Sequence, residues 1–155
     1  FWLSTDLDTQ ERLARLMRRT RELAASTLAI FNGEVLRHHQ EEEQELFPAV
    51  LRSATGEERH KAGAMVARLQ AEHRWIERLW RELEPVLKVV ARGRGDALDA
   101  GLVTQLVSLY GQHATFEERE FLPFAQKVLG RDPRHLEALG LALHMRRIPS
   151  ISGHI

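Results

Sequence analysis

Two segments of the sequence carry the same arrangement of histidine, glutamate and proline. One runs from His38 to Pro48 and the other from His113 to Pro123, and both read His-x-x-x-Glu-Glu-x-x-apolar-apolar-Pro. The offset between the copies is 75 residues at the histidine, at the glutamates and at the proline. Because an eleven-residue pattern repeated without a gap is not expected by chance, the shared residues indicate a shared role. Imidazole nitrogens and carboxylate oxygens are ligands that iron, manganese and zinc accept.

The spacing within each copy places the histidine and the first glutamate on one face of a helix. Residues four apart lie one turn apart on the same side, so His38 pairs with Glu42 and His113 pairs with Glu117. Both pairs continue the apolar stripe of their segment, and a carboxylate that points into a protein interior is costly unless it is paired or binds a metal. We therefore predict that these four side chains are metal ligands. The alternative is a solvated charged face.

A third pair lies between the two copies. His73 stands on an apolar stripe and Glu77 follows it by one turn, which again gives His-x-x-x-Glu. We expect both to join a dinuclear site with open positions for a small ligand. Glu77 alone is equally compatible with a surface or supporting position, and His73 with a core histidine that is hydrogen-bonded.

His39 is a further candidate ligand, because it also neighbours Glu42 on a helix. It aligns with Ala114 in the second copy, so the repeat favours His38 as the ligand of this segment. His39 is then an additional ligand or a partner that supports one.

Helices are the elements that must position these residues. Glycine and proline are sparse and stand between segments in which apolar residues recur every three or four positions, and no segment alternates as a strand does. The first helix is predicted to begin near Asp8 or Thr9, to bend or break at Asn32-Gly33, and then to carry the first motif to Pro48, where it is expected to kink or to end.

The later helices have clearer boundary signals. Thr55 and Glu58 form a capping box for a second helix that closes at Gly93. A third helix is predicted to begin at Asp96 and to carry the second motif, and Asp132-Pro133 announces a short last helix. The predicted fold class is all-α, with long helices joined by short loops.

The composition is that of an ordinary globular protein. The chain has 155 residues, of which 43% are hydrophobic and 28% charged, and we expect a single domain over residues 1–155. Basic and acidic residues each number 22, so the excess of basic residues typical of nucleic-acid and membrane-surface proteins is missing. Thiolate sites are excluded because there is no cysteine. No long apolar run suggests a membrane span, and we expect a cytoplasmic protein without nucleic-acid or membrane partners.

The paired motifs, with a lone histidine between them, resemble the hemerythrin-like HHE cation-binding domain family. The resemblance extends from about residue 9 to Arg147. It implies an up-and-down four-helix bundle that holds a non-haem di-iron centre, although such His/Glu sites also accept zinc or manganese. Carried over by matching position, the implied ligands are His38, Glu42, His73, His113 and Glu117.

Two features depart from the family pattern. Hemerythrins proper have a histidine one turn after the central one, where this chain has Glu77, which makes the site richer in carboxylate. The family also places a ligand histidine on a helix before the first motif, whereas no histidine precedes His38. We therefore expect the first helix of the bundle to be missing or truncated, with Phe1-Trp2-Leu3 as its end, or to be completed by another chain in a homodimer.

The function that the resemblance implies is metal binding coupled to a small ligand. We expect a di-iron protein that binds or senses O2, NO or the iron and redox state, rather than an enzyme. A di-iron enzyme acting on peroxide or nitric oxide is an alternative at the same site. A ferritin-like iron-handling protein ranks lower, because that class shows Glu-x-x-His rather than His-x-x-x-Glu. A structural bundle without metal is the remaining alternative.

Overall fold

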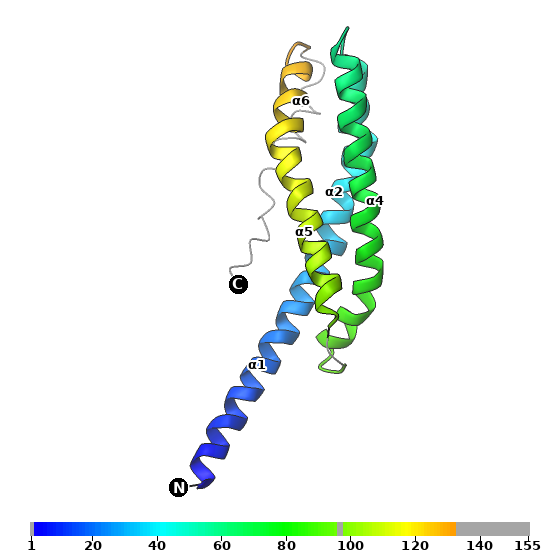
Figure 1. Ribbon diagram of the computed structural model, residues 1–155. Coiled ribbons are helices and arrows are strands. Elements are labelled where there is room, and N and C mark those ends of the chain that lie inside the picture. The colour runs from blue at the N-terminus through cyan, green and yellow to red at the C-terminus, as the bar shows by residue number, and fades with distance from the viewer. Residues whose placement is uncertain (1, 96–97, 133–155) are drawn as a thin grey trace. The chain divides into compact units, whose positions relative to one another are not determined.

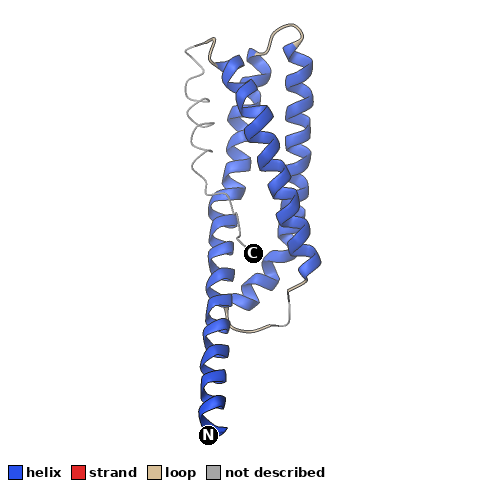
Figure 2. Ribbon diagram, turned by 60° about the vertical axis from the view of Figure 1, so that its left-hand side comes forward, coloured by secondary structure: helices blue, strands red, loops and turns tan. Residues whose placement is uncertain are grey.

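The described part of the chain is built from helices. The computed structural model describes residues 2–95 and 98–132, with side chains from residue 8 onward. Every regular element within these ranges is a helix (Figure 1, Figure 2). The prediction of an all-α fold is therefore confirmed, while the short last helix expected after Asp132 lies outside the described residues.

The helices form three continuous runs. The first comprises α1 (Trp2–Ile30), the π-helical turn η1 (Phe31–Val35), α2 (Leu36–Glu41), the π-helical turn η2 (Glu42–Leu46) and α3 (Phe47–Ser53). The second is α4 (Glu58–Ala91). The third comprises α5 (Ala100–Phe116), the π-helical turn η3 (Glu117–Phe121) and α6 (Leu122–Leu129). The three long helical segments predicted from the sequence are therefore present.

The first run differs in detail from its prediction. α1 begins at Trp2 rather than near Asp8, because neither proline nor glycine interrupts the residues before Asp8. Trp2 and Leu3 therefore lie inside the helix that leads to the first motif, and not at the end of a separate one. At Asn32-Gly33 the α-helical geometry is interrupted, as the sequence predicts, by the π-helical turn η1, after which the helix continues as α2.

α4 begins and ends where the sequence predicts. The backbone N–H of Thr55 donates to Glu58 Oε2 at 3.2 Å, which is one half of the expected capping box. At the other end Gly93 has a φ of 74°, and the N–H of Arg94 donates to the carbonyl of Val89 at 3.1 Å. This is the bond pattern by which a left-handed glycine closes a helix.

α5 begins later than predicted because a different aspartate caps it. The Oδ1 atom of Asp99 accepts hydrogen bonds from the backbone N–H of Gly101 at 2.8 Å and of Leu102 at 3.2 Å. Asp96 lies outside the described residues, but Leu98 and Asp99 are not helical. The first free N–H groups of this helix are therefore satisfied by Asp99.

The chain groups into two compact units. The first unit combines Phe1–Leu36 with Glu77–Val107, and the second combines Arg37–Ile76 with Ser108–Ile155. Both motif copies and His73 belong to the second unit, where α3 contacts α6. The apolar core of this unit includes the large buried side chains of Leu46, Phe47, Leu69, Phe121, Leu122 and Leu129.

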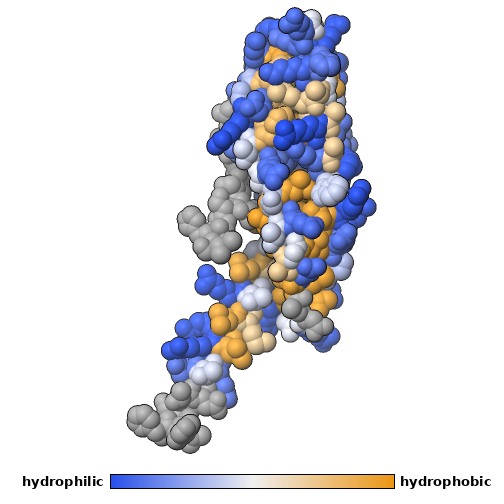
Figure 3. All heavy atoms as spheres, in the orientation of Figure 1, coloured by the Kyte–Doolittle hydropathy of each residue, from blue (hydrophilic) through white to orange (hydrophobic). Residues whose placement is uncertain are grey.

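The first unit buries only part of the apolar stripe of its long helix. The rings of Phe31 and Trp80 stack with their centroids 4.2 Å apart, which joins η1 to α4. Figure 3 shows hydrophobic surface along α1. Among the α1 residues whose side chains are described, the exposed large apolar ones are Leu13, Leu16, Met17 and Leu23. None of the described helices is long and apolar enough to span a membrane.

Both motif copies contain a π-helical turn in the same register, which the sequence analysis did not predict. η2 begins at Glu42 and η3 begins at Glu117. In each turn the carbonyl of that glutamate accepts a hydrogen bond from the N–H five residues later, from Phe47 in one copy and Leu122 in the other. Such turns occur often at functional sites, and here they start at the two glutamates predicted as ligands.

A proline follows each of these two turns. Pro48 and Pro123 lie in the first turn of α3 and of α6, where the N–H that proline lacks is not required by the new helix. Proline is not the only cause of such a turn, because η1 forms without one. At the end of η2 two consecutive residues, Leu46 and Phe47, are both buried in the core of the second unit.

Candidate metal centre

The first motif copy brings two histidines and a glutamate into the second unit. His38 and His39 lie on α2, and Glu42 is the first residue of η2. Glu42 is fully buried, whereas the side chain of His38 is 13% exposed. The Nε2 atom of His38 lies 3.5 Å from Glu42 Oε1. The i, i+4 pair therefore faces the same way, as its spacing predicts.

His39 lies deeper in the site than the repeat suggested. Its ring stacks on that of His73 with centroids 3.8 Å apart and meets the ring of His113 edge-on at 5.7 Å. His39 follows the buried Val35 by one helical turn, so both lie on the inner face of the run. The repeat could not reveal this, because the second copy has Ala114 at the matching position.

α4 supplies the central histidine of the site. His73 is fully buried, with its Nε2 atom 3.1 Å from Glu42 Oε2 and its Nδ1 atom 2.8 Å from Glu43 Oε1. An ionised carboxylate can only accept a hydrogen bond, so the contact with Glu43 favours the neutral form of His73 that carries its proton on Nδ1. The lone pair of Nε2 is then directed towards Glu42.

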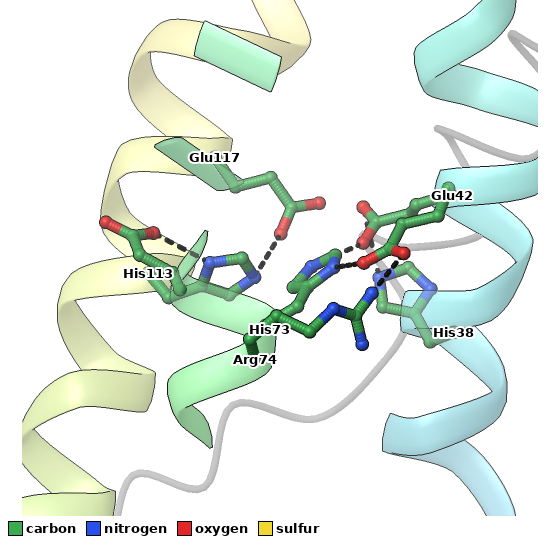
Figure 4. Close-up of polar contacts among 8 residues, drawn as sticks. His38, Glu42, His73, Arg74, His113 and Glu117 are labelled. Carbon is green, nitrogen blue, oxygen red and sulfur yellow. Dashed lines mark hydrogen bonds and ion pairs between the residues drawn. The ribbon is translucent and has the colours of Figure 1, made fainter. Parts of the chain in front are cut away.

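The second motif copy repeats this arrangement from α5 and η3. The Nε2 atom of His113 lies 3.5 Å from Glu117 Oε2, and both side chains are buried. The Nδ1 atom of His113 lies 2.9 Å from Glu72 Oε2, and this contact also favours the neutral form with its proton on Nδ1. Figure 4 shows His113 and Glu117 directed towards His73 and Glu42.

The donor side chains form two groups of three. Within each group the possible ligand atoms all lie within 4.8 Å of one another. The first group, which is purely imidazole, comprises His39, His73 and His113. The second group, which has one imidazole and two carboxylates, comprises His38, Glu42 and Glu117. Five of these six residues are buried and His38 is half-buried, so the two groups lie in the interior of the second unit.

The hydrogen bonding at the centre of the site fits a bound cation. Among the residues that the structure describes, neither oxygen of Glu42 has a hydrogen-bond partner, and neither does Nε2 of His73. Leaving a buried acceptor unsatisfied costs about 1–3 kcal/mol, and more for a charged group. When Glu42 is ionised, lone pairs of the two residues face one another, and a positive ion between them would satisfy both.

The distances between donors fit a metal ion as well. The imidazole nitrogens lie 3.1–3.5 Å from the carboxylate oxygens that they face. Two ligands that are each about 2.1 Å from one metal, at tetrahedral or right angles, are roughly 3.0–3.4 Å apart. The separations between these donor atoms are therefore close to those expected between ligands of one ion, and two of the pairs, His73–Glu42 and His113–Glu117, link the two groups.

Burial sets the protonation of the metal-free site. It raises the pKa of Glu42 well above the ordinary value, with the charge of Glu117 adding to the effect, and it raises the pKa of Glu117 to about 7. Burial lowers the pKa of His39 to about 3 and also lowers the pKa values of His73 and His113. The imidazoles are therefore neutral near pH 7, as ligands must be, while a cation would replace the protons held by the carboxylates.

Glu77 is the one predicted ligand that belongs to neither group. It follows His73 by one turn on α4 and is half-buried. In the described part of the chain, the groups able to hold a metal draw their carboxylates from the two motif copies. The hypothesis that Glu77 is a ligand stays a prediction.

Two carboxylates contact the site histidines although the sequence analysis did not single them out. Glu43, which follows Glu42 in the first motif copy, lies against His73. Glu72, which precedes His73 in the sequence, contacts His113 on another helix. No spacing rule predicts either contact, because each joins residues from different helical runs.

Family membership follows from a comparison of the whole chain with family models. The model of the hemerythrin HHE cation-binding domain matches residues 3–125. The chain belongs to this hemerythrin family. No curated protein and no solved structure matches it. The matched range includes both motif copies and α4, so the resemblance seen in the motifs is confirmed. Membership implies cation binding, and the two donor groups of this hemerythrin-like chain could hold metal.

Proposed function

We propose that this hemerythrin-family protein binds two iron ions and serves as a binding or sensing module for O2 or NO. The observation that carries the proposal is the pair of adjacent three-donor groups in one buried site. Two groups favour two ions, and the carboxylates of Glu42 and Glu117 supply negative charge that partly balances them. Glu42 and Glu117 belong to the second group and also face His73 and His113 of the first group. These contacts between the groups are the reason to expect one dinuclear centre rather than two separate sites.

The donor types support iron over softer metals. Imidazole and carboxylate suit iron, with zinc and manganese as competitors, and the chain has no thiolate to offer. Three protein donors per ion leave coordination positions open, as in other non-haem iron sites. Iron bound there would supply a redox-active centre able to take up a diatomic molecule. The chain's own contribution is to present neutral imidazoles and to keep bulk water away from the ions.

The burial of the site supports a small ligand. His39, Glu42 and His73 are at most 2% exposed, and His113 and Glu117 are at most 7% exposed. A diatomic gas can reach such a position through small fluctuations, whereas a large organic substrate requires a preformed cavity. His38 is the most accessible donor, so it marks the side from which a ligand would enter.

Metal content together with an optical spectrum tests the proposal. Protein isolated without air from iron-supplemented cells is expected to hold about two irons per chain, one for each group, and its spectrum should change when O2 or NO is added. The double variant Glu42→Gln/Glu117→Gln should lose both ions. His60→Ala, which changes an exposed histidine at the start of α4, should keep them.

Two results would contradict the proposal. A stoichiometric single zinc, or a folded protein that binds no metal when iron is supplied, would remove the dinuclear iron site. Full iron occupancy with a spectrum that neither O2 nor NO changes would retain the metal but remove the sensing role.

A further inference from the structure

An arginine on α4 holds the carboxylate that contacts the central histidine. Arg74 is paired through its Nη2 atom with Glu43 Oε2. The other oxygen of Glu43 lies 2.8 Å from Nδ1 of His73. The side chains become more exposed from the imidazole outward, at 0% for His73, 21% for Glu43 and 52% for Arg74. The three side chains form a chain of hydrogen bonds and ion pairs, here a relay of charge, from solvent to the buried site.

A second relay of the same composition reaches the other buried histidine. Arg68 Nε donates to Glu72 Oε1 at 2.8 Å, and Glu72 Oε2 lies 2.9 Å from Nδ1 of His113. The exposed fraction again rises outward, from 3% for His113 through 16% for Glu72 to 50% for Arg68. The guanidinium of Arg68 also lies over the ring of Phe116, 3.7 Å from its centroid, which holds the arginine in place.

The order of groups in each relay, guanidinium, then carboxylate, then imidazole, determines which neutral form of the imidazole it stabilises. A guanidinium stays protonated at all ordinary pH values and stabilises the neighbouring carboxylate as an anion. An anionic carboxylate accepts only the Nδ1–H form of the imidazole, which leaves Nε2 free to donate its lone pair. A carboxylate behind a ligating imidazole also makes the ring a stronger ligand.

We infer that the Arg74–Glu43 and Arg68–Glu72 pairs are positioning elements that keep the protons of His73 and His113 on Nδ1. They thereby set the metal affinity of the group formed by these two histidines and His39. The inference about affinity rests on the proposed metal function, whereas the inference about the proton position does not. Both relays end on the purely imidazole group, so the group with two carboxylates should be affected less.

The repeat offers a matched control for the first relay. Glu43 and Glu118 are the second glutamates of the two copies and align at the common offset. Glu43 contacts His73, whereas Glu118 is exposed. Changing either to glutamine removes one charge next to a ligand glutamate, but only Glu43→Gln acts on a relay.

The first test measures proton positions in the full-length wild-type protein without metal. Two-dimensional ¹⁵N–¹H spectra of the histidine rings distinguish the two neutral forms. We expect His73 and His113 to show the Nδ1–H form. A proton on Nε2 of either ring would overturn the inference for that relay, and this measurement needs no variant to fold.

The second test measures affinity with zinc, which is a redox-inert probe, in competition with a chromophoric chelator. Glu43→Gln and Glu72→Gln should each bind one of two zinc ions at least about tenfold more weakly, the range found when partners of ligating histidines are changed. Glu118→Gln should stay within about twofold of wild type on the same scale. Arg74→Gln, which leaves Glu43 in place, should weaken the same ion by a smaller factor.

The outcomes separate this inference from the proposed function. Glutamine keeps the shape and one acceptor of glutamate, so wild-type affinity in Glu43→Gln and Glu72→Gln would show that the charge has no role and would overturn the relays. An equal loss in Glu118→Gln would overturn them too. If wild-type protein bound no zinc or iron while its rings showed the Nδ1–H form, the metal function would fail and the positioning role would stand.

Discussion

In the first motif copy two adjacent histidines reach the candidate metal centre, whereas in the second copy only one does. His39 joins the imidazole group, while its counterpart Ala114 adds no donor. The second glutamates differ as well, since Glu43 contacts His73 and Glu118 is exposed. The copies nevertheless share their inward glutamates and the π-helical turns that begin at them.

This difference shows which features belong to the repeat and which belong to its surroundings. The motif carries the local helical geometry, because i, i+4 spacing and a π-helical turn before proline are properties of one segment. The roles of His39 and Glu43 depend on α4, which presents His73 to the first copy. Equal segments thus acquire unequal chemistry from the helix that lies against them.

The largest difference between the copies is expected at their inward glutamates. Glu42 faces an imidazole of each donor group, His38 at 3.5 Å and His73 at 3.1 Å, whereas the imidazole that faces Glu117 is His113 of the purely imidazole group, at 3.5 Å. Glu42→Gln should therefore reduce bound metal from two ions to almost none, and Glu117→Gln should retain about one of the two ions that the groups can hold. Metal analysis of the purified variants measures this, and equal losses would show that the two copies are equivalent.

Removing the extra histidine should make the first copy resemble the second. His39→Ala deletes one of three imidazoles from the first group, so we expect about one ion in place of two, with the remaining ion held by the other group. Zinc titration of the metal-free protein measures the number of ions. Two ions bound at wild-type affinity would mean that His39 is a packing residue. His38, which the repeat favours, would then be the ligand histidine of the first copy.

A smaller effect is expected on the stability of the metal-free protein as pH changes. The folded pKa of Glu117, about 7, lies above its ordinary value of 4.5, so its protonated form favours folding. This contribution is present below pH 4.5 and is lost as pH rises towards 7. Relative to Glu117→Gln, wild type should therefore lose stability, on the order of 2 kcal/mol, between pH 5 and pH 7.

Urea unfolding of both proteins at the two pH values measures this difference, and contributions from the histidines cancel in it. The histidines act in the opposite direction. Because the pKa of His39 is lowered from 6.5 to about 3, the folded protein loses stability as pH falls below 6.5. A difference between wild type and Glu117→Gln that is independent of pH would rule out a buried, protonated Glu117.

The smallest effects are expected at the two prolines. If packing of the residues after each turn maintains the π-helical geometry, as η1 without a proline suggests, then Pro48→Ala and Pro123→Ala should each change stability by only about 1 kcal/mol. Both variants should keep their metal. Thermal unfolding and metal analysis check this, and loss of metal in either variant would make proline the cause of the turn at that glutamate.

Much of this protein could be predicted from its sequence, because the information is local. The helical class, the boundary at Gly93 and the inward direction of the two His-x-x-x-Glu pairs follow from residues within one or two turns of each other. The family match over residues 3–125 agrees with this interpretation. A repeated local pattern was enough to identify Glu42 and Glu117 as buried carboxylates that need a partner.

Only the tertiary structure decided how the donor side chains divide into two groups. The placement of His39 beside His73, the contacts of Glu43 and Glu72 with imidazoles, and the position of Glu77 outside both groups each depend on which helix faces which. The start of α5 at the Asp99 cap rather than at Asp96 depended on a choice between two equally suitable residues. Spacing along one helix specifies the direction of a side chain, but what that side chain meets is determined by a neighbouring helix that is distant in the sequence.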